Sequence, residues 1–304
     1  KLAAFNGGYF RADLEDGKVV ISDLRMGLTP NYVFRFAVAA QTPEGFVEVP
    51  PERRGIERSA EGSHARVIGA IAEAHCLSHD RDAVLAALTA PATRIVSLTV
   101  TEKGYGISRA TGGGDEAHAA IAHDLAAPDA PIGVAGLLVW ALMARRAAGV
   151  APFTVLCCDN LPENGRMLRK LLIDFARRAV PEMEAFIASE VAFPSTMVDR
   201  ITPAATPATL AAAEEMTGMR DEAAVETEAF SQWVIEDKFP TGRPAWEAAG
   251  AMFVEDVRPY EEMKLRLLNG SHSLLAYLGY LAGYQTVADT MADGDFRRLA
   301  RAFM

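Results

Sequence analysis

Four polar residues near the end of the chain share one side of a predicted helix. They lie in the stretch EEMKLRLLNGSHSLL, residues 261–275, which is otherwise mainly Met and Leu. Measured from Lys264 at about 100° per residue, Glu261 lies about 60° away. His272 lies about 80° and Asn269 about 140° away on the same scale. An amine, a carboxylate, an imidazole and an amide can exchange protons and donate hydrogen bonds, so this side of the helix either lines a site or is an ordinary solvated face.

A second polar cluster, CCDNLPENG, follows a short apolar run. Asp159 and Asn160 come at the carboxyl end of this predicted buried strand, which is where open α/β sheets bind ligands. The alternative is a plain strand-to-helix turn, in which Asp, Asn and Gly are common; Asn164-Gly165 then opens the next helix. A third segment, FPSTMVDRITP, contains Asp199, which either belongs to a site or forms a structural ion pair with Arg200.

Strands that alternate with helices must position these residues. The apolar runs after residue 57 predict strands over residues 64–74, 93–105, 152–160 and 189–194. Helical spacing predicts helices over residues 80–90, 132–149 and 164–179, with Asp80 as a cap and Gly149 as a stop, and a largely helical chain from residue 259. Strands this apolar, separated by helices, indicate a parallel sheet covered by helices.

The first 54 residues have a different pattern, with short alternating runs and turns near residues 15–17 and 42–45. They predict a small antiparallel element, ended by Pro50-Pro51 as a linker or as the scar of a fusion. We therefore expect three parts: an unrelated β-rich tail (1–54), an α/β domain (55–255), and a linker helix with the start of a helical domain (256–304). Since the sequence starts with Lys1 and ends in a helix-like run, we expect a fragment or a rearranged gene product.

Composition narrows the class of partner. The formal net charge is −10, which argues against nucleic-acid or anionic-membrane partners, since both need a positive surface. The three cysteines, Cys76, Cys157 and Cys158, suit a reducing cytoplasm better than a disulfide framework and have no zinc-site spacing. The longest apolar run, 132–143, is too short to span a membrane, and no signal peptide is visible. We expect a small-molecule substrate and a monomer or weak oligomer.

Five segments, in one order and close to one spacing, carry a family resemblance: CDNLPENG, FPSTMVDRITP, QWVIEDKF, GRPAWE and MKLRLLNGSH. Together they resemble the mannitol dehydrogenase family of polyol-specific long-chain dehydrogenases, from about Glu57 to Met304. SLTVTEKGY and NGSHSLLAYLGYLAGYQTVADTM look closer to its fructuronate reductase (mannonate oxidoreductase) branch than to mannitol 2-dehydrogenase. The resemblance implies an α/β fold, here an incomplete Rossmann-like parallel sheet followed by the start of an all-helical C-terminal domain. It also implies hydride transfer between NAD, with NADP left open, and a secondary alcohol, either mannonate/fructuronate or mannitol/fructose.

The resemblance also implies a role for each matched residue. Lys264 matches the general base that takes the alcohol proton, and Asn160 and Asn269 match the amides that stabilise the developing alkoxide. His272 matches a residue that orients substrate hydroxyls, and Glu261 a proton relay to water. The matches at the cofactor are Asp199, Thr99 and Asn160.

A lysine base sets a physical condition. The ordinary lysine pKa of about 10.4 must fall towards ~7–8 for the amine to act as a base at neutral pH. We expect burial among Met263, Leu265, Leu267 and Leu268 to lower it. We expect no catalytic metal, because no zinc ligands are recognisable, and there is no suitably placed Tyr-x-x-x-Lys pair for the other common strategy.

The chain departs from the family where the dinucleotide should bind. Neither Gly7-Gly8 nor Gly112-Gly113-Gly114 forms the G-x-G-x-x-G turn that holds a pyrophosphate. We therefore expect this polypeptide to bind NAD weakly, and an inactive truncated or chimeric remnant is the alternative function. DLRMGLTPNYVFRF in the tail faintly resembles bacterial inner-membrane metal-dependent hydrolases, without their metal site, and a membrane-associated hydrolase rests on this segment alone.

Overall fold

The computed structural model describes residues 80–100, 102–218, 221 and 224–304 in full. Between residues 2 and 78 it describes the backbone of nine strands, and side chains at residues 63, 65, 75, 77 and 78 alone. Predictions that depend on other side chains of the first 79 residues, or on Cys76, lie outside the described residues.

The described helices lie after residue 80 and are mostly short. The α-helices are α1 (Arg81–Thr89), α2 (Ala119–Ala126), α3 (Val134–Ala147), α4 (Asn164–Ala179), α5 (Glu184–Glu190), α6 (Pro207–Thr217), α7 (Arg258–Met263), α8 (Gly270–Leu281), α9 (Val287–Ala292) and α10 (Gly294–Phe303). Short 3₁₀ turns are η1 (Glu102–Tyr105), η2 (Pro181–Met183) and η3 (Trp246–Ala249), and η4 (Lys264–Asn269) is a π-helix.

The strands divide into those before and those after α1. The earlier strands are β1 (Leu2–Phe5), β2 (Gly8–Glu15), β3 (Lys18–Met26), β4 (Tyr32–Phe36), β5 (Ala40–Thr42), β6 (Gly45–Val47), β7 (Arg54–Ser59), β8 (Gly62–Val67) and β9 (Ile71–Cys76). The later strands are β10 (Ile95–Leu98), β11 (Thr154–Cys157), β12 (Thr196–Asp199), β13 (Val225–Glu228), β14 (Gln232–Glu236) and β15 (Met252–Val254).

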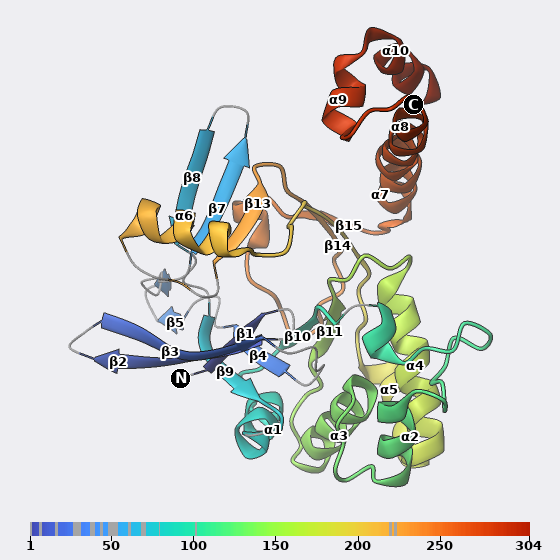
Figure 1. Cartoon of the computed structure of the whole chain (residues 1–304). Coiled ribbons are helices and arrows are strands. Elements are labelled where there is room, and N and C mark those ends of the chain that lie inside the picture. The colour runs from blue at the N-terminus through green and yellow to red at the C-terminus, as the bar shows by residue number, and fades with distance from the viewer. Residues whose placement is uncertain are drawn as a thin grey trace.

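The main core forms where β10 and β11 pair in parallel and α3 and α4 pack together (Figure 1). All four residues of β11 are buried, as its apolar sequence predicts. Helix α3 ends just before Gly149, whose φ of +67° is a left-handed conformation that favours glycine. Helix α4 occupies the predicted residues, and its buried side includes Leu168, Leu171 and Phe175. The helices predicted over residues 80–90, 132–149 and 164–179 are therefore confirmed.

The strand predicted over SEVAFP is wrong. Residues 184–190 form α5, the next five are irregular, and β12 begins at Thr196. Pro194 has no N–H to donate to a sheet ladder, which shortens the strand from its N-terminal side. The irregular segment still lies beside β11, because the Val155 N–H donates to Ala192 O at 2.9 Å.

The pairing around β14 is mixed. Strands β14 and β15 are parallel, whereas β12 and β14 are antiparallel. The parallel pairing that we expected is therefore confirmed for β10–β11, whereas β14 and β15 lie where we predicted no strand. The predicted strand over residues 64–74 is two strands, β8 and β9, in separate sheets.

The first 54 residues include antiparallel pairs where turns are predicted. Strands β2 and β3 pair with Glu15 opposite Lys18, and β5 and β6 with Thr42 opposite Gly45. Strand β4 pairs with β9, so strands on the two sides of residue 54 pair with one another. The division of the chain at residue 54 stays a prediction.

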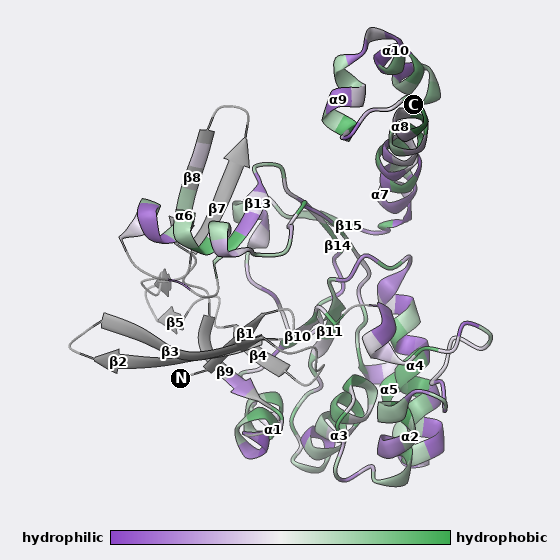
Figure 2. Cartoon of the chain, viewed as in Figure 1, coloured by the Kyte–Doolittle hydropathy of each residue, from purple (hydrophilic) through white to green (hydrophobic). Residues whose placement is uncertain are grey.

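Helices α7 to α10, with η4, form a helical arm that extends from the α/β part of the chain (Figure 1). Figure 2 shows much of α8 in the colour of hydrophobic residues, and Tyr277, Tyr280 and Leu281 are 75–79% exposed. Across the fully described part of the chain, no helix combines the length and apolarity needed to cross a bilayer.

Candidate active site

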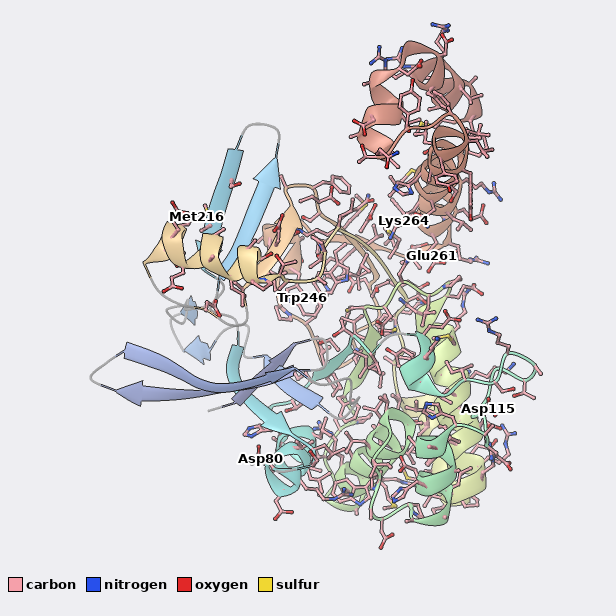
Figure 3. All side chains as sticks on the ribbon, in the orientation of Figure 1. Asp80, Asp115, Met216, Trp246, Glu261 and Lys264 are labelled. Carbon is pink, nitrogen blue, oxygen red and sulfur yellow. The ribbon has the colours of Figure 1, made fainter. Side chains whose placement is uncertain are left out.

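Lys264 lies at the junction between the helical arm and the α/β part. Figure 3 shows Glu261 and Lys264 at the end of the arm nearest that part. Lys264 Nζ donates to Val198 O at 2.5 Å and to Asn160 Oδ1 at 3.3 Å, and lies 3.5 Å from Asp199 Oδ1. The side chain of Lys264 is only 12% exposed. Three of the predicted site residues therefore meet, from segments 65 and 104 residues distant from the lysine.

The expected apolar surroundings of Lys264 are wrong. Its four neighbours Met263, Leu265, Leu267 and Leu268 are 38–61% exposed. The lysine is covered instead by the end of β12 and by Asn160, which present a carbonyl, an amide oxygen and a carboxylate. A helix turns its lysine and the adjacent leucines to different sides, so burial of one does not bury the others.

Lys264 and Asn269 begin and end the π-helix η4, in a segment that we expected to be α-helical. The Gly270 N–H donates to Leu265 O, a bond to the fifth residue back. In an α-helix, Lys264 and Asn269 would lie about 140° apart; the wider π turn reduces this angle. A π-helix replaces the better α-helical bonds and often occurs at functional sites.

Gly270 allows another close approach. A Cβ added there would lie 3.1 Å from Cε1 of Phe303, in α10. Gly270, the first residue of α8, therefore allows α10 to pack closely against α8.

The loop after β11 fixes the backbone at Asn160. The preceding carboxylate, Asp159 Oδ2, accepts hydrogen bonds from the Val100 N–H at 2.8 Å and from the Tyr105 hydroxyl at 2.5 Å. Burial, with Cys157 and Asp159 adding to it, raises the pKa of Tyr105, so this phenol keeps its proton and donates. The carboxyl ends of β10 and β11 are thus tied together beside Asn160.

The amide of Asn160 has a defined orientation. Its Oδ1 accepts from Lys264 at 3.3 Å, which leaves Nδ2 as the end that can donate to a ligand. The residue is exposed, so a ligand can reach this donor.

Glu261 contacts the same loop one turn before the lysine. Its carboxylate oxygens lie 3.1 and 3.3 Å from the donating Glu163 N–H. Glu163 has a φ of +46°, the one positive value among the described non-glycine residues. Burial raises the pKa of Glu261, and the Glu236 carboxylate adds to the rise. Asn160–Lys264 and Glu163–Glu261 therefore connect the same two segments at two points.

Three predicted site residues make no side-chain hydrogen bond within the described part of the chain. Asn269 is half-buried, whereas His272 and Thr99 are exposed. Thr99 follows β10 directly, on the same sheet edge as Asn160. Asp199 has the lysine as its partner, while Arg200 donates to Glu228 O at 3.0 Å.

The motifs QWVIEDKF and GRPAWE contribute to an aromatic cluster that includes Trp233 of β14 and Phe253 of β15. The rings of Trp233 and Trp246 are 5.0 Å apart, and Trp246 stacks on Phe253 at 6.5 Å. Arg243 lies over the Phe253 ring at 3.3 Å and donates to both oxygens of Asp237. This cluster supports the strand β15, after which α7 begins, so these motifs position the arm.

Sequence reasoning missed two parts of the site. The acceptor closest to Lys264 is the main-chain oxygen of Val198, for which side-chain identity carries no signal. Asn164 was assigned only to the start of a helix, yet it is fully buried and its amide donates to Asp159 O in the loop after β11 and to Thr196 O in β12. The second asparagine of the motif CDNLPENG is Asn164, and its place in a family motif is the sequence feature that could have indicated a further role.

Gly165→Ala should destabilise the protein, because α4 crosses the chain before β12 at this residue. An added Cβ would lie 2.5 Å from Phe193 O and 2.7 Å from Pro194 C and O, and backbone atoms cannot rotate away. We expect a loss of about 1–3 kcal/mol in the free energy of unfolding, measured by urea titration. Gly294→Ala is the control, since the nearest atoms there are arginine ends at 3.8 Å. Equal stability of the two variants would contradict this packing.

No cluster of three or more His, Cys, Asp or Glu side chains suited to a metal ion occurs in the part of the chain that the structure describes.

Two family domains match the chain in sequence. Residues 53–248 match the mannitol dehydrogenase Rossmann domain, and residues 256–304 match the mannitol dehydrogenase C-terminal domain. The chain belongs to the mannitol dehydrogenase family. The Rossmann-like α/β fold followed by helical C-terminal residues, expected from the sequence, is thereby confirmed.

Individual relatives are named for different substrates. The D-mannonate oxidoreductase of Escherichia coli is 48% identical over 249 residues, which cover 82% of this chain and 51% of the relative. A mannitol 2-dehydrogenase of Aspergillus clavatus is 42% identical over 300 residues, covering 94% of this chain and 58% of the relative. That alignment extends beyond the residues that the two family domains match.

A solved structure of another protein is similar to this chain in both fold and sequence. The Pseudomonas fluorescens mannitol 2-dehydrogenase, in a ternary complex with NAD and D-mannitol, is 45% identical with a TM-score of 0.73. The match covers 83% of this chain and 51% of that one. The chain thus spans about half the length of these relatives.

Proposed function

We propose that this chain carries the catalytic centre of a nicotinamide-dependent oxidoreductase that acts on a secondary alcohol of a sugar acid or polyol, with mannonate and fructuronate as the substrate pair. The observation that supports this most is the contact of Lys264 Nζ with Asn160 Oδ1 and Val198 O. It joins an amine that can exchange a proton to an amide that can stabilise an alkoxide.

Lys264 exchanges the proton of the substrate hydroxyl. In alcohol oxidation the neutral amine accepts the O–H proton, and in ketone reduction the ammonium returns it to the oxygen. The carbonyl of Val198, the amide oxygen of Asn160 and the carboxylate of Asp199 all stabilise the ammonium. This acceptor set suits a lysine that acts as an acid in ketone reduction.

Asn160 and Asn269 bind the substrate oxygen. With its Oδ1 held by Lys264, Asn160 directs Nδ2 to the developing alkoxide, and a neutral donor stabilises that charge without adding one of its own. We assign the second amide to Asn269, at the far end of the same π-helix, and the orientation of the other hydroxyls to His272.

NAD fits the sheet edge next to these residues. Thr99 and Asn160 follow the carboxyl ends of β10 and β11, and Asp199 is the last residue of β12. Thr99 and Asn160 offer uncharged polar groups for ribose or amide contacts. When bound, the nicotinamide supplies or accepts the hydride. Thr99 and Asn160 are exposed, so a bound cofactor can reach both side chains.

Glu261 relays the proton between Lys264 and water, which predicts a pH effect. Since burial raises its pKa, the carboxylate becomes available as a proton acceptor at a higher pH than that of an ordinary glutamate. Alcohol oxidation should therefore increase as the pH rises through this pKa, and Glu261→Gln should remove that limb of the kcat–pH profile. Glu262→Gln, at an exposed neighbour that pairs with Arg266, is the control. If the kcat–pH profile of Glu261→Gln were superimposable on that of the unsubstituted protein, a proton relay through Glu261 would be excluded.

The reaction can be tested in a complete relative. In the mannonate chimera, residues 53–304 of this chain, the span of its two family domains, replace the corresponding residues of the E. coli D-mannonate oxidoreductase. We expect oxidation of NADH with fructuronate. A folded chimera without hydride transfer would contradict the proposed function and support an inactive remnant.

The substrate can be tested in a second host. The alternative, mannitol and fructose, is favoured by the 45% identity to the P. fluorescens mannitol 2-dehydrogenase. If the residues of this chain favour the sugar acid, placing them in that enzyme should raise the ratio of kcat/KM for fructuronate to that for fructose by about tenfold. An unchanged ratio would favour the mannitol alternative.

A further inference from the structure

Asn164 is a fully buried asparagine whose two amide ends are both used by main-chain groups. Its Nδ2 donates to Asp159 O at 3.1 Å and to Thr196 O at 2.9 Å. Its Oδ1 accepts from the Thr196 N–H at 2.9 Å. One side chain thus joins the loop after β11 to the first residue of β12.

These two segments carry the groups that hold Lys264. Asn160 follows Asp159 directly, and Val198 and Asp199 follow Thr196 by two and three residues in the same short strand. A second link runs in parallel, since the Thr196 hydroxyl donates to Cys157 O at 2.6 Å. The spacing between the acceptors of Lys264 therefore depends on the bonds of Asn164 and Thr196.

The amide does not serve the helix that it begins. Residue 163 is the N-cap of α4, and no side chain makes a capping bond there. An apolar residue would fill a buried position without the cost of removing an amide from water, which only complete pairing offsets. Pairing of both amide ends to the loop after β11 and to β12 indicates that the amide maintains the relative position of this loop and this strand.

We propose that Asn164 is a positioning residue, which sets the distance between the Asn160 and Val198 acceptors so that both hold the Lys264 amine. The catalytic meaning of this inference rests on the proposed function. The contacts themselves can be tested without turnover, because the chain contains only six lysines and their ammonium signals can be resolved.

The experiment follows the ¹⁵N-labelled lysine side chains of this chain by NMR. Lys264→Met assigns the signal of Lys264, whose protons should exchange slowly because they are held by Val198 O and Asn160 Oδ1. Asn164→Asp places an oxygen where Nδ2 now donates to two carbonyls, and we expect the exchange of the Lys264 protons to become at least about tenfold faster, as for the loss of one bond to a charged group. Spectra are taken where circular dichroism shows every variant to be folded.

Two neighbouring substitutions keep the test decisive. Thr196→Val removes the hydroxyl link and keeps the main-chain bonds of Asn164, so it should speed exchange even if Asn164→Asp does not fold. Ser195→Ala is the control, because the buried Ser195 hydroxyl has no hydrogen-bond partner among the described residues.

Lower melting temperatures with unchanged Lys264 exchange in Asn164→Asp and Thr196→Val would overturn the inference and leave Asn164 as a purely structural residue. Fast exchange of Lys264 in the parent chain would also overturn it. Neither result removes the proposed reaction, which fails separately if Lys264→Met keeps its rate of hydride transfer in the mannonate chimera.

Discussion

Lys264→Ala should lower kcat for fructuronate reduction by the mannonate chimera about 10²–10⁴-fold, the usual contribution of a general acid or base. The variant loses the proton donor, while the oxygen acceptors that held the amine are left to water. Stopped-flow absorbance of NADH under single-turnover conditions measures the loss, and circular dichroism verifies the fold. The affinity for NADH should change little, since the role that we propose for Lys264 is at the substrate oxygen and not at the cofactor.

Lys170→Ala is the matched control for this substitution. Lys170 lies on the exposed side of α4, and its loss should leave kcat within about twofold of the parent, as for most surface substitutions. A rate for Lys264→Ala close to that of Lys170→Ala would remove Lys264 from the proton transfer.

Asn160→Ala should lower kcat by about 10²–10³-fold, or about 2.7–4 kcal/mol of barrier, because one donor to the alkoxide is lost. Asn160→Asp keeps the shape and the acceptor for Lys264, yet places a negative charge beside the developing one. We expect it to be at least as slow as Asn160→Ala. A nearly normal rate for Asn160→Asp would exclude the amide as an alkoxide donor.

A double-mutant cycle tests whether the amide and the amine act together. Lys264 Nζ and Asn160 Oδ1 are in direct contact at 3.3 Å, so the losses should not add. The Lys264→Ala/Asn160→Ala protein should be less impaired than the product of the single effects predicts. Full additivity would indicate that the contact has no part in catalysis.

The elements with strong local signals were predictable from sequence. The buried strand β11, and α3 and α4, have apolar spacing that few other structures satisfy, and Gly149 marks a helix end. The meeting of Lys264, Asn160 and Asp199 was predictable from family resemblance alone, because no spacing rule relates residues so far apart in the sequence.

The surroundings of Lys264 were not predictable, for two physical reasons. Apolar neighbours in sequence point to other sides of a helix, and Leu265 is in fact 61% exposed. The π-helix η4 leads into Gly270, where Phe303 approaches from α10, and such a tertiary contact leaves no local pattern in the sequence. Asn164 was overlooked because asparagine is common where helices begin, and its amide bonds only across segments distant in sequence.

The most direct test of the role of Lys264 is chemical rescue of the Lys264→Ala chimera by small primary amines. A replacement amine that enters the space beside Asn160 and Val198 should restore hydride transfer in proportion to its concentration, with an effect that depends on its basicity. A variant that stays slow at every amine concentration, with a rate also insensitive to pH, would contradict proton transfer by this lysine.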